Sequence, residues 1–226
     1  MHVRKDIAAM MQDLKFEKTK IVLAESNRQV RSNIRSMLHS MGFREPLEAE
    51  NLEDLRAILH EEEPDIMLCD LDLAGADAGG DLYEMIANLR RCRMGRNPFM
   101  AVIATSWMAD EILVNRSIDS GFDGFLVKPL SAERLSSRVR SLAKKSRSFI
   151  VSGDYVGPPR RSLTAPESKQ FYELEVPNTL QLRAVGQLVD TRQFLGAINS
   201  IQKALLKIEK ISPEISIEGE PARAAM

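Results

Sequence analysis

Short apolar runs alternate with helix-like patterns from residue 20 to about residue 147, and this alternation restricts the fold more than any other feature of the chain. The runs span residues 21–24, 46–49, 66–69, 100–104 and 125–127. Between them, apolar side chains recur at three- and four-residue steps, as they do along one face of a helix. Strands that are apolar along their whole length are typical of a parallel sheet covered on both faces. We therefore predict an α/β fold, a doubly wound five-stranded parallel sheet with right-handed crossovers through the helices.

Residues that favour helix ends stand where this alternation requires them. Asn27, Asn51 and Ser131 each precede a helix-like pattern, where their side chains can cap free backbone N–H groups. Gly42 follows the first of these helices, where a residue in the left-handed conformation is expected. The end signals therefore agree with five strands that alternate with five helices.

The chain divides into several units around this sheet domain. We expect a short helix over residues 1–19, the sheet domain over 20–146, a Pro/Gly-rich irregular arm over 147–177, an amphipathic helical segment over 178–211 and a disordered tail over 212–226. Gly186 and Gly196 would weaken or break the helical segment. Arg160 and Arg161 fit either an exposed loop or a contact with an acidic or phosphate-bearing partner.

The composition narrows the class of protein and its surroundings. A formal net charge of -1 provides no general attraction to nucleic acid, and no apolar run approaches the roughly 20 residues of a membrane span. The N-terminus has no apolar signal-peptide core, and Cys69 and Cys92 lack any metal-binding or redox motif. We therefore expect a cytoplasmic protein in a reducing compartment, with no membrane contact.

Polar side chains end or follow four of the apolar runs, namely Glu25, Asp70, Thr105 and Lys128. Because the carboxyl ends of parallel strands lie along one edge of a sheet, we expect these four side chains to converge on one site. Two acids, a hydroxyl and an ammonium are suited to placing a phosphoryl group on an aspartate and holding it there.

Four sequence motifs surround these residues. They are Ile-Val-Leu-Ala-Glu25-Ser26-Asn27, Pro64-Asp65-Ile-Met-Leu-Cys-Asp70-Leu-Asp72-Leu, Val-Ile-Ala-Thr105-Ser106 and Gly121-Phe-Asp-Gly124-Phe125-Leu-Val-Lys128-Pro129. In order and spacing, over roughly residues 20–145, they resemble the receiver domain of two-component response regulators. The resemblance implies a flavodoxin-like fold and a place in a phosphorelay, with a histidine kinase or a phosphotransfer protein as the partner.

The resemblance also implies a role for each matching residue. Asp70 would be the phosphoacceptor, and Thr105 and Lys128 would bind the phosphoryl oxygens. Phe125 would be the aromatic side chain whose rotamer follows the switch. A cis peptide bond would join Lys128 to Pro129, a form that is otherwise uncommon and that aims the lysine.

A phosphoryl group carries negative oxygens that a divalent cation must help to offset. Mg²⁺ takes one or two carboxylates and several waters, and the expected ligands are Glu25, Asp70 and the backbone carbonyl of Asp72. Receiver domains usually have two adjacent acids after the first strand, whereas this chain has Glu25 and Ser26. We therefore expect Mg²⁺ to bind more weakly than usual.

Other functions remain as alternatives. Because Ser26 replaces the usual acid, the chain could be an atypical pseudo-receiver, an interaction module that works without phosphorylation. A haloacid-dehalogenase-like phosphatase, which the string Asp70-Leu71-Asp72 resembles, needs a later acidic pair that we do not find at a strand end. A DNA-binding regulator needs a helix-turn-helix with a basic recognition helix, and no such pattern follows residue 145.

We therefore predict a response regulator and not an enzyme. It would signal through phosphorylation-controlled protein-protein interaction with an unknown downstream protein, and nucleic acid is not an expected partner. The helical segment 178–211 offers a contact through which two copies of the chain could form a homodimer.

Overall fold

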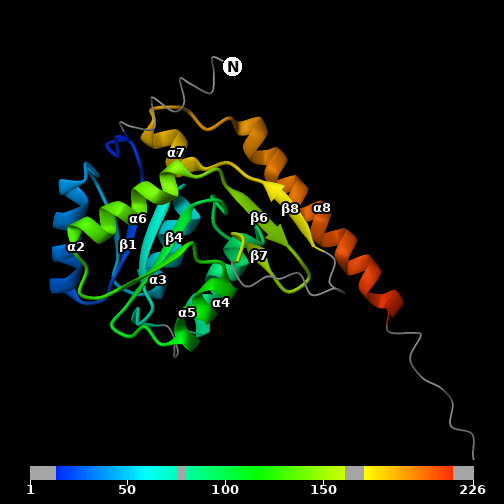
Figure 1. Ribbon diagram of the computed structural model, residues 1–226, viewed down its shortest axis with the longest axis horizontal. Coiled ribbons are helices and arrows are strands. Elements are labelled where there is room, and N and C mark those ends of the chain that lie inside the picture. The colour runs from blue at the N-terminus through cyan, green and yellow to red at the C-terminus, as the bar shows by residue number, and fades with distance from the viewer. Residues whose placement is uncertain (1–13, 76–79, 161–170, 216–226) are drawn as a thin grey trace, which may run out of the picture.

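The computed structural model describes residues 14–75, 80–160 and 171–215, and its centre is a parallel sheet with the strand order β2-β1-β3-β4-β5 (Figure 1). The strands are β1 (Ile21–Ala24), β2 (Leu47–Ala49), β3 (Ile66–Asp70), β4 (Ala101–Ser106) and β5 (Gly124–Val127). The helices between and after them are α2 (Arg28–Ser40), α3 (Leu52–Glu61), α4 (Gly80–Arg90), α5 (Glu111–Ser120) and α6 (Ala132–Lys144). The predicted doubly wound α/β fold is confirmed.

Each face of the sheet has its own apolar core, because side chains alternate along a strand. Val22 and Ala24 of β1 lie in a core with the apolar residues of α3 and α4. Ile21 and Leu23 of the same strand lie in a second core with α2 and α6. Burial on both faces explains why the strands are apolar along their whole length.

The predicted helix caps are present in the structure. The side chain of Asn27 accepts hydrogen bonds from two backbone N–H groups at the start of α2. Asn51 and Ser131 each accept one such hydrogen bond, at the start of α3 and of α6. Gly42 follows α2 with a φ of 101°, a left-handed conformation that glycine adopts without strain. These caps set the point at which each loop of the sheet edge turns into a helix.

The N-terminal segment corrects one expectation. Residues 1–13 lie outside the described part of the chain, and residues 14–19, predicted as the end of a helix, are not helical. Leu14 and Phe16 are buried with exposed Lys15 between them, which is the two-residue period of an extended chain. Phe16 stacks on Phe43 with 4.9 Å between ring centroids, and the backbone N–H of Lys15 donates to the carbonyl of Ala184. Residues 14–19 are therefore held by long-range contacts and not by a helix.

The segment 147–177, predicted to be irregular, contains three strands. They are β6 (Ser148–Val151), β7 (Val156–Gly157) and β8 (Tyr172–Glu175), which form an antiparallel sheet in the order β7-β6-β8. Phe149 and Val151 are fully buried in a core of their own. Pro158 and Pro159 come directly after β7, where the ladder has ended and a missing N–H does no harm. The prolines thus mark the end of a strand here.

We call the chain from residue 147 onward the C-terminal extension. Two helices follow its three strands, α7 (Thr179–Ala184) and α8 (Thr191–Ile215). Gly186, with a φ of 76°, lies in the break between them, whereas Gly196 is inside α8. The predicted helical segment is therefore two helices, and α8 continues to residue 215, into the tail that was expected to be disordered. Figure 1 shows α8 beside the extension sheet, on which Ile201 and Ile208 are buried.

The extension also packs on the sheet domain. The ring of Phe99, which precedes β4, lies 5.7 Å from that of Phe149 and 5.1 Å from that of Phe194, in edge-to-face contacts. Within the described residues, no helix has the length and apolar character needed to cross a membrane. The proposed homodimer contact stays a prediction.

Candidate functional site

Three charged side chains meet at the carboxyl edge of the parallel sheet. The Nζ atom of Lys128 lies 2.5 Å from Oε2 of Glu25 and 2.8 Å from Oδ2 of Asp70. All three are buried, with side-chain exposures of 1%, 3% and 6% for Lys128, Glu25 and Asp70. The structure therefore brings together three of the four residues that end or follow the apolar runs, through direct contacts.

The strand order explains this meeting. Strands β1 and β3 are neighbours, and Ala24 pairs with Cys69, so Glu25 and Asp70 follow at the same level of the sheet. Lys128 follows β5, two strands away from β3, and its long side chain reaches back over β4. The backbone N–H of Lys128 donates to the carbonyl of Ser106 at 2.8 Å, and the peptide bond from Lys128 to Pro129 is cis.

The other predicted residues lie around this cluster at different depths. Thr105 is buried on β4 and is the register partner of Asp70. Phe125 on β5 is partly buried and packs against the core that α3 and α4 share. The side chain of Asp72 is exposed. Thr105 is therefore beside Asp70. The ligand predicted from Asp72 is its backbone carbonyl, and it stays a prediction.

Glu25 is held from its backbone and its side chain. Its Oε1 accepts a hydrogen bond of 2.9 Å from the backbone N–H of Asn27, and its carbonyl accepts one of 2.7 Å from Nη1 of Arg31. Arg31 is itself buried and paired with Glu48 and Glu50. No sequence motif predicts this role of Arg31, although its position with Ile34 and Leu38 on the buried face of α2 is a usable signal.

The charges of Glu25, Asp70 and Lys128 do not cancel. Two carboxylates and one ammonium leave one negative charge without a counterion among the three groups. In the described part of the chain, Oδ1 of Asp70 is buried and has no hydrogen-bond partner. A buried carboxylate oxygen without a partner is costly, so this atom is the point at which a cation or an electrophile would be stabilised.

Two carboxylates with one free oxygen fit the modest protein share of a Mg²⁺ site, in which waters fill most positions. The hydroxyl of Ser26 accepts a hydrogen bond of 2.7 Å from the backbone N–H of Ala74, so it is engaged and carries no charge. Among the described residues, no three His, Cys, Asp or Glu side chains are grouped to hold a metal. Glu25 and Asp70 are the buried carboxylates that could ligate the ion, together with the predicted backbone carbonyl of Asp72.

Two residues beside Asp70 and Lys128 have clear local roles. Trp107, the single tryptophan, is 57% exposed, and the Nζ atom of Lys128 lies 5.6 Å from its ring centroid. The indole therefore lies next to the ammonium of Lys128. Burial raises the pKa of the Cys69 thiol, which keeps it protonated and excludes it as a nucleophile.

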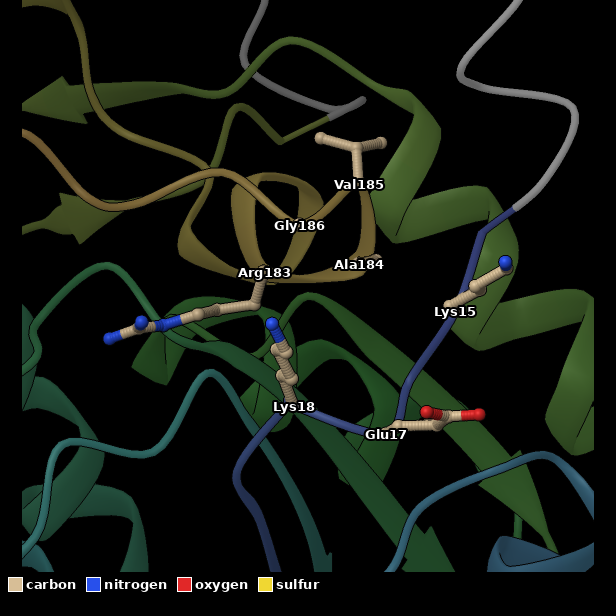
Figure 2. Close-up of a pocket in the computed structure, with 7 residues that line it drawn as sticks. All are labelled: Lys15, Glu17, Lys18, Arg183, Ala184, Val185 and Gly186. Carbon is tan, nitrogen blue, oxygen red and sulfur yellow. The ribbon is translucent and has the colours of Figure 1, made fainter.

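A separate cavity of about 330 Å³ lies between the N-terminal segment and the end of α7 (Figure 2). Lys15, Lys18 and Arg183 line it, but Figure 2 shows the charged ends of Lys15 and Arg183 pointing away from each other. Glu17 on its rim pairs with Arg44. These cations do not converge on one point, so the cluster at Asp70 remains the candidate site.

Comparison with known proteins identifies the family of the sheet domain. A sequence profile of the family described as "Response regulator receiver domain" matches residues 21–140. The chain belongs to this family. Its receiver domain is therefore the sheet domain that carries Glu25, Asp70, Thr105 and Lys128.

Two curated relatives are transcriptional regulators. The phosphate regulon transcriptional regulatory protein PhoB of Escherichia coli is 28% identical over 133 residues, which cover 58% of this chain and 55% of that protein. The transcriptional regulatory protein AfsQ1 of Streptomyces coelicolor is 24% identical over 183 residues, which cover 77% of this chain and 76% of that protein. The chain thus spans about half the length of PhoB.

Solved receiver domains also align with the chain. A CheY-like receiver domain protein from Methanospirillum hungatei has a TM-score of 0.47 and 18% identity, and the alignment covers 54% of this chain and 91% of that one. The receiver domain of the sensor histidine kinase PA1611 of Pseudomonas aeruginosa has a TM-score of 0.46 and 23% identity, with 54% and 94% covered. That neighbour has a magnesium ion coordinated in its active site cleft.

Proposed function

We propose that Asp70 of this response regulator accepts a phosphoryl group, with Mg²⁺, from a histidine kinase or a phosphotransfer protein. The observation that carries the proposal is the pair of contacts from Lys128 to Glu25 and Asp70, beside a buried Asp70 oxygen that has no partner in the described part of the chain. The role is that of a phosphoryl acceptor and not of an enzyme with turnover.

In the transfer step, Oδ1 of Asp70 forms a bond to phosphorus while the bond from phosphorus to the donor's leaving atom breaks. Lys128 then contacts a phosphoryl oxygen, so its ammonium offsets charge that develops in the transition state. Thr105, beside Asp70 in the register, donates its hydroxyl to another phosphoryl oxygen. Mg²⁺ held by Glu25 and Asp70 would supply additional positive charge to these oxygens.

The proposed output is a change in the contacts that the chain makes with a downstream protein. When Thr105 moves toward the phosphoryl group, Phe125, which pairs with Ala104 on the neighbouring strand and packs against the core shared by α3 and α4, changes its rotamer. The phosphoryl group shifts the population toward this arrangement, because it binds that arrangement better. Exposed apolar residues near the site, including Trp107 and Ile112, would then present a different surface.

The test uses a small-molecule phosphodonor. Acetyl phosphate with Mg²⁺ should add the mass of one phosphoryl group to the wild type and to Asp72→Asn, whose side chain is exposed, but not to Asp70→Asn. Beryllofluoride, a phosphoryl mimic, should change the emission of Trp107 in the wild type. If wild type and Asp70→Asn both stay unmodified, the phosphoacceptor role is wrong and the pseudo-receiver interpretation replaces it.

Transcriptional regulation is a second candidate, because PhoB and AfsQ1 are transcriptional regulators and the match to AfsQ1 continues beyond the receiver domain. An electrophoretic shift of generic duplex DNA at moderate salt would support this function. A weak response that disappears with added salt would indicate only nonspecific phosphate contacts.

A further inference from the structure

The connection between α5 and β5 is held by the C-terminal extension. Residues 155–160, here called the clasp, follow β6, include β7 and lie against the end of α5. This end of α5 is opposite to the one that follows Trp107 and the phosphorylation site. One helix therefore joins the site to the extension.

Arg160 makes the polar part of the clasp. Its Nη1 lies 2.7 Å from Oδ1 of Asp119, and its Nη2 donates a hydrogen bond of 3.0 Å to the carbonyl of the same residue. The guanidinium also stacks on Tyr155, 3.4 Å from the ring centroid. A cation is favoured at this point, because the carboxyl end of a helix carries partial negative charge.

Two glycines let the backbones approach closely. Gly121 ends α5 with a φ of 99°. A Cβ on Gly157 would lie 3.1 Å from the Cα of Gly121 and 2.6 Å from the hydroxyl oxygen of Tyr155. A Cβ on Gly121 would lie 3.4 Å from the carbonyl oxygen of Val156. Side chains would not fit between these backbones, so the clasp and the end of α5 are complementary in shape.

A second contact holds the far end of the same connection. Arg147, which precedes β6, pairs with Asp123 at 2.7 Å, and Arg90 of α4 pairs with the same carboxylate at 2.9 Å. Asp123 leads directly into β5 and so toward Lys128. The connection from Asp119 to Asp123 is thus fixed to the extension at both ends.

The body of α5 buries little apolar surface. Ser117 is its buried residue, whereas Ile112 is 79% exposed and Ile118 is 37% exposed. A helix with so little buried apolar surface can move as a unit at a modest cost in free energy. The contacts at its end therefore have a large share in setting its position.

We propose that the clasp regulates the phosphorylation site by holding α5 in the position that accompanies the contacts of Lys128 with Glu25 and Asp70. A phosphoryl group on Asp70 and the contacts of the clasp with α5 then favour different positions of α5. Because coupling between two sites is reciprocal, loss of the contact between Arg160 and Asp119 favours phosphorylation of Asp70, and phosphorylation favours loss of that contact. The extension would thereby sense the state of the site. This inference rests on the proposed phosphoacceptor function.

The coupling is tested with Arg160→Gln, Asp119→Asn and the double variant. Beryllofluoride with Mg²⁺ is titrated into each, and the emission of Trp107 is followed. Each single variant should bind beryllofluoride about five-fold more tightly than the wild type, and the double variant no more tightly than the singles, because all three remove one contact. Arg134→Gln, an exposed arginine of α6, is the control and should bind like the wild type.

Hydrogen exchange separates this proposal from the phosphoacceptor function. In the protein without beryllofluoride, the amides of α5 should exchange faster in Arg160→Gln and Asp119→Asn than in the wild type, while those of α2 stay unchanged. Asp119 is 60% exposed, so its variant is expected to fold. Unchanged exchange in α5, or equal beryllofluoride affinities of wild type and variants, would overturn the clasp. A wild type without any beryllofluoride response would instead refute the phosphoacceptor function and with it the coupling, while the exchange result would still decide whether the clasp holds α5.

Discussion

The substitution Asp123→Asn tests the buried ion network that joins the receiver domain to its extension. The Asp123 carboxylate is 3% exposed and lies 2.9 Å from Nη2 of Arg90 and 2.7 Å from Nη1 of Arg147. It also accepts a hydrogen bond of 2.7 Å from the backbone N–H of Val102. Asparagine keeps the shape of the side chain but removes its charge, so two buried guanidinium groups lose their counterion.

The expected loss is large because both arginines are out of water. The exposures of their side chains are 0% for Arg90 and 7% for Arg147. Removing one partner of a buried ion pair typically costs about 3–5 kcal/mol, since the remaining charge stays buried. Burial alone would raise the pKa of Asp123, but Arg147 and Arg90 outweigh it and hold that pKa below its ordinary value. The carboxylate is thus charged at neutral pH, and stability from it is lost only as the pH falls below about 4.

Urea unfolding at pH 7, followed by circular dichroism, measures this loss. With a slope of about 2–3 kcal/mol per molar urea, a loss of 3–5 kcal/mol moves the midpoint by more than about 1 M. Glu17→Gln is the control, because Glu17 pairs with Arg44 at the surface, where their exposures are 56% and 71%. It should cost less than about 1 kcal/mol. If Asp123→Asn costs no more than this control, the network contributes little and the reasoning is refuted.

Three further predictions address the metal, the pH dependence and the backbone. Ser26→Asp should tighten Mg²⁺ binding at least about ten-fold in calorimetric titration, because a carboxylate about 4 Å from a divalent ion attracts it by roughly 2 kcal/mol even in water; an unchanged affinity would speak against the Glu25 site. Burial raises the pKa of the Asp65 carboxyl from 3.8 to about 6. Between these pH values the carboxyl keeps its proton in the folded state but has lost it in the unfolded chain. The free energy of unfolding should therefore fall as the pH rises through that range, and Asp65→Asn should show a flatter profile in urea titrations; identical profiles would contradict the assignment. Gly157→Ala should destabilise the protein by about 1–3 kcal/mol through its clash with Tyr155, whereas Gly196→Ala, which meets nothing within 4 Å inside α8, should stabilise it by about 0.5–1 kcal/mol; equal thermal midpoints for the two variants would refute this.

Much of the receiver domain was predictable because local patterns encode it. The apolar runs became strands, and Asn27, Asn51 and Ser131 became helix caps. The meeting of Asp70 with Lys128 followed from a general rule, since parallel strands present their carboxyl ends at one edge. The burial of Arg31 and Arg90 was not predictable, because a charged residue on an apolar helix face is buried only if distant acids or carbonyls accept its hydrogen bonds.

The extension shows the opposite case. Proline and glycine between residues 153 and 159 predicted an irregular arm, but the neighbouring Phe149 and Val151 form a sheet whose partner strand, β8, lies more than twenty residues further on. Residues 14–19, predicted as the end of a helix, are likewise extended, in contact with Phe43 and Ala184. In both segments the structure depends on contacts with residues far away along the chain, which a local sequence pattern does not show.

The amino-acid order by itself therefore determined the strands, the helix ends and the edge at which the acidic and basic groups of the site gather, because these depend on periodicity and on the handedness of the chain. Tertiary structure alone decided that Lys128 bridges Glu25 and Asp70, that Asp123 lies between two arginines and that Arg160 reaches Asp119. These contacts join residues far apart along the chain. Their geometry exists only once the sheet, the helices and the extension have packed together.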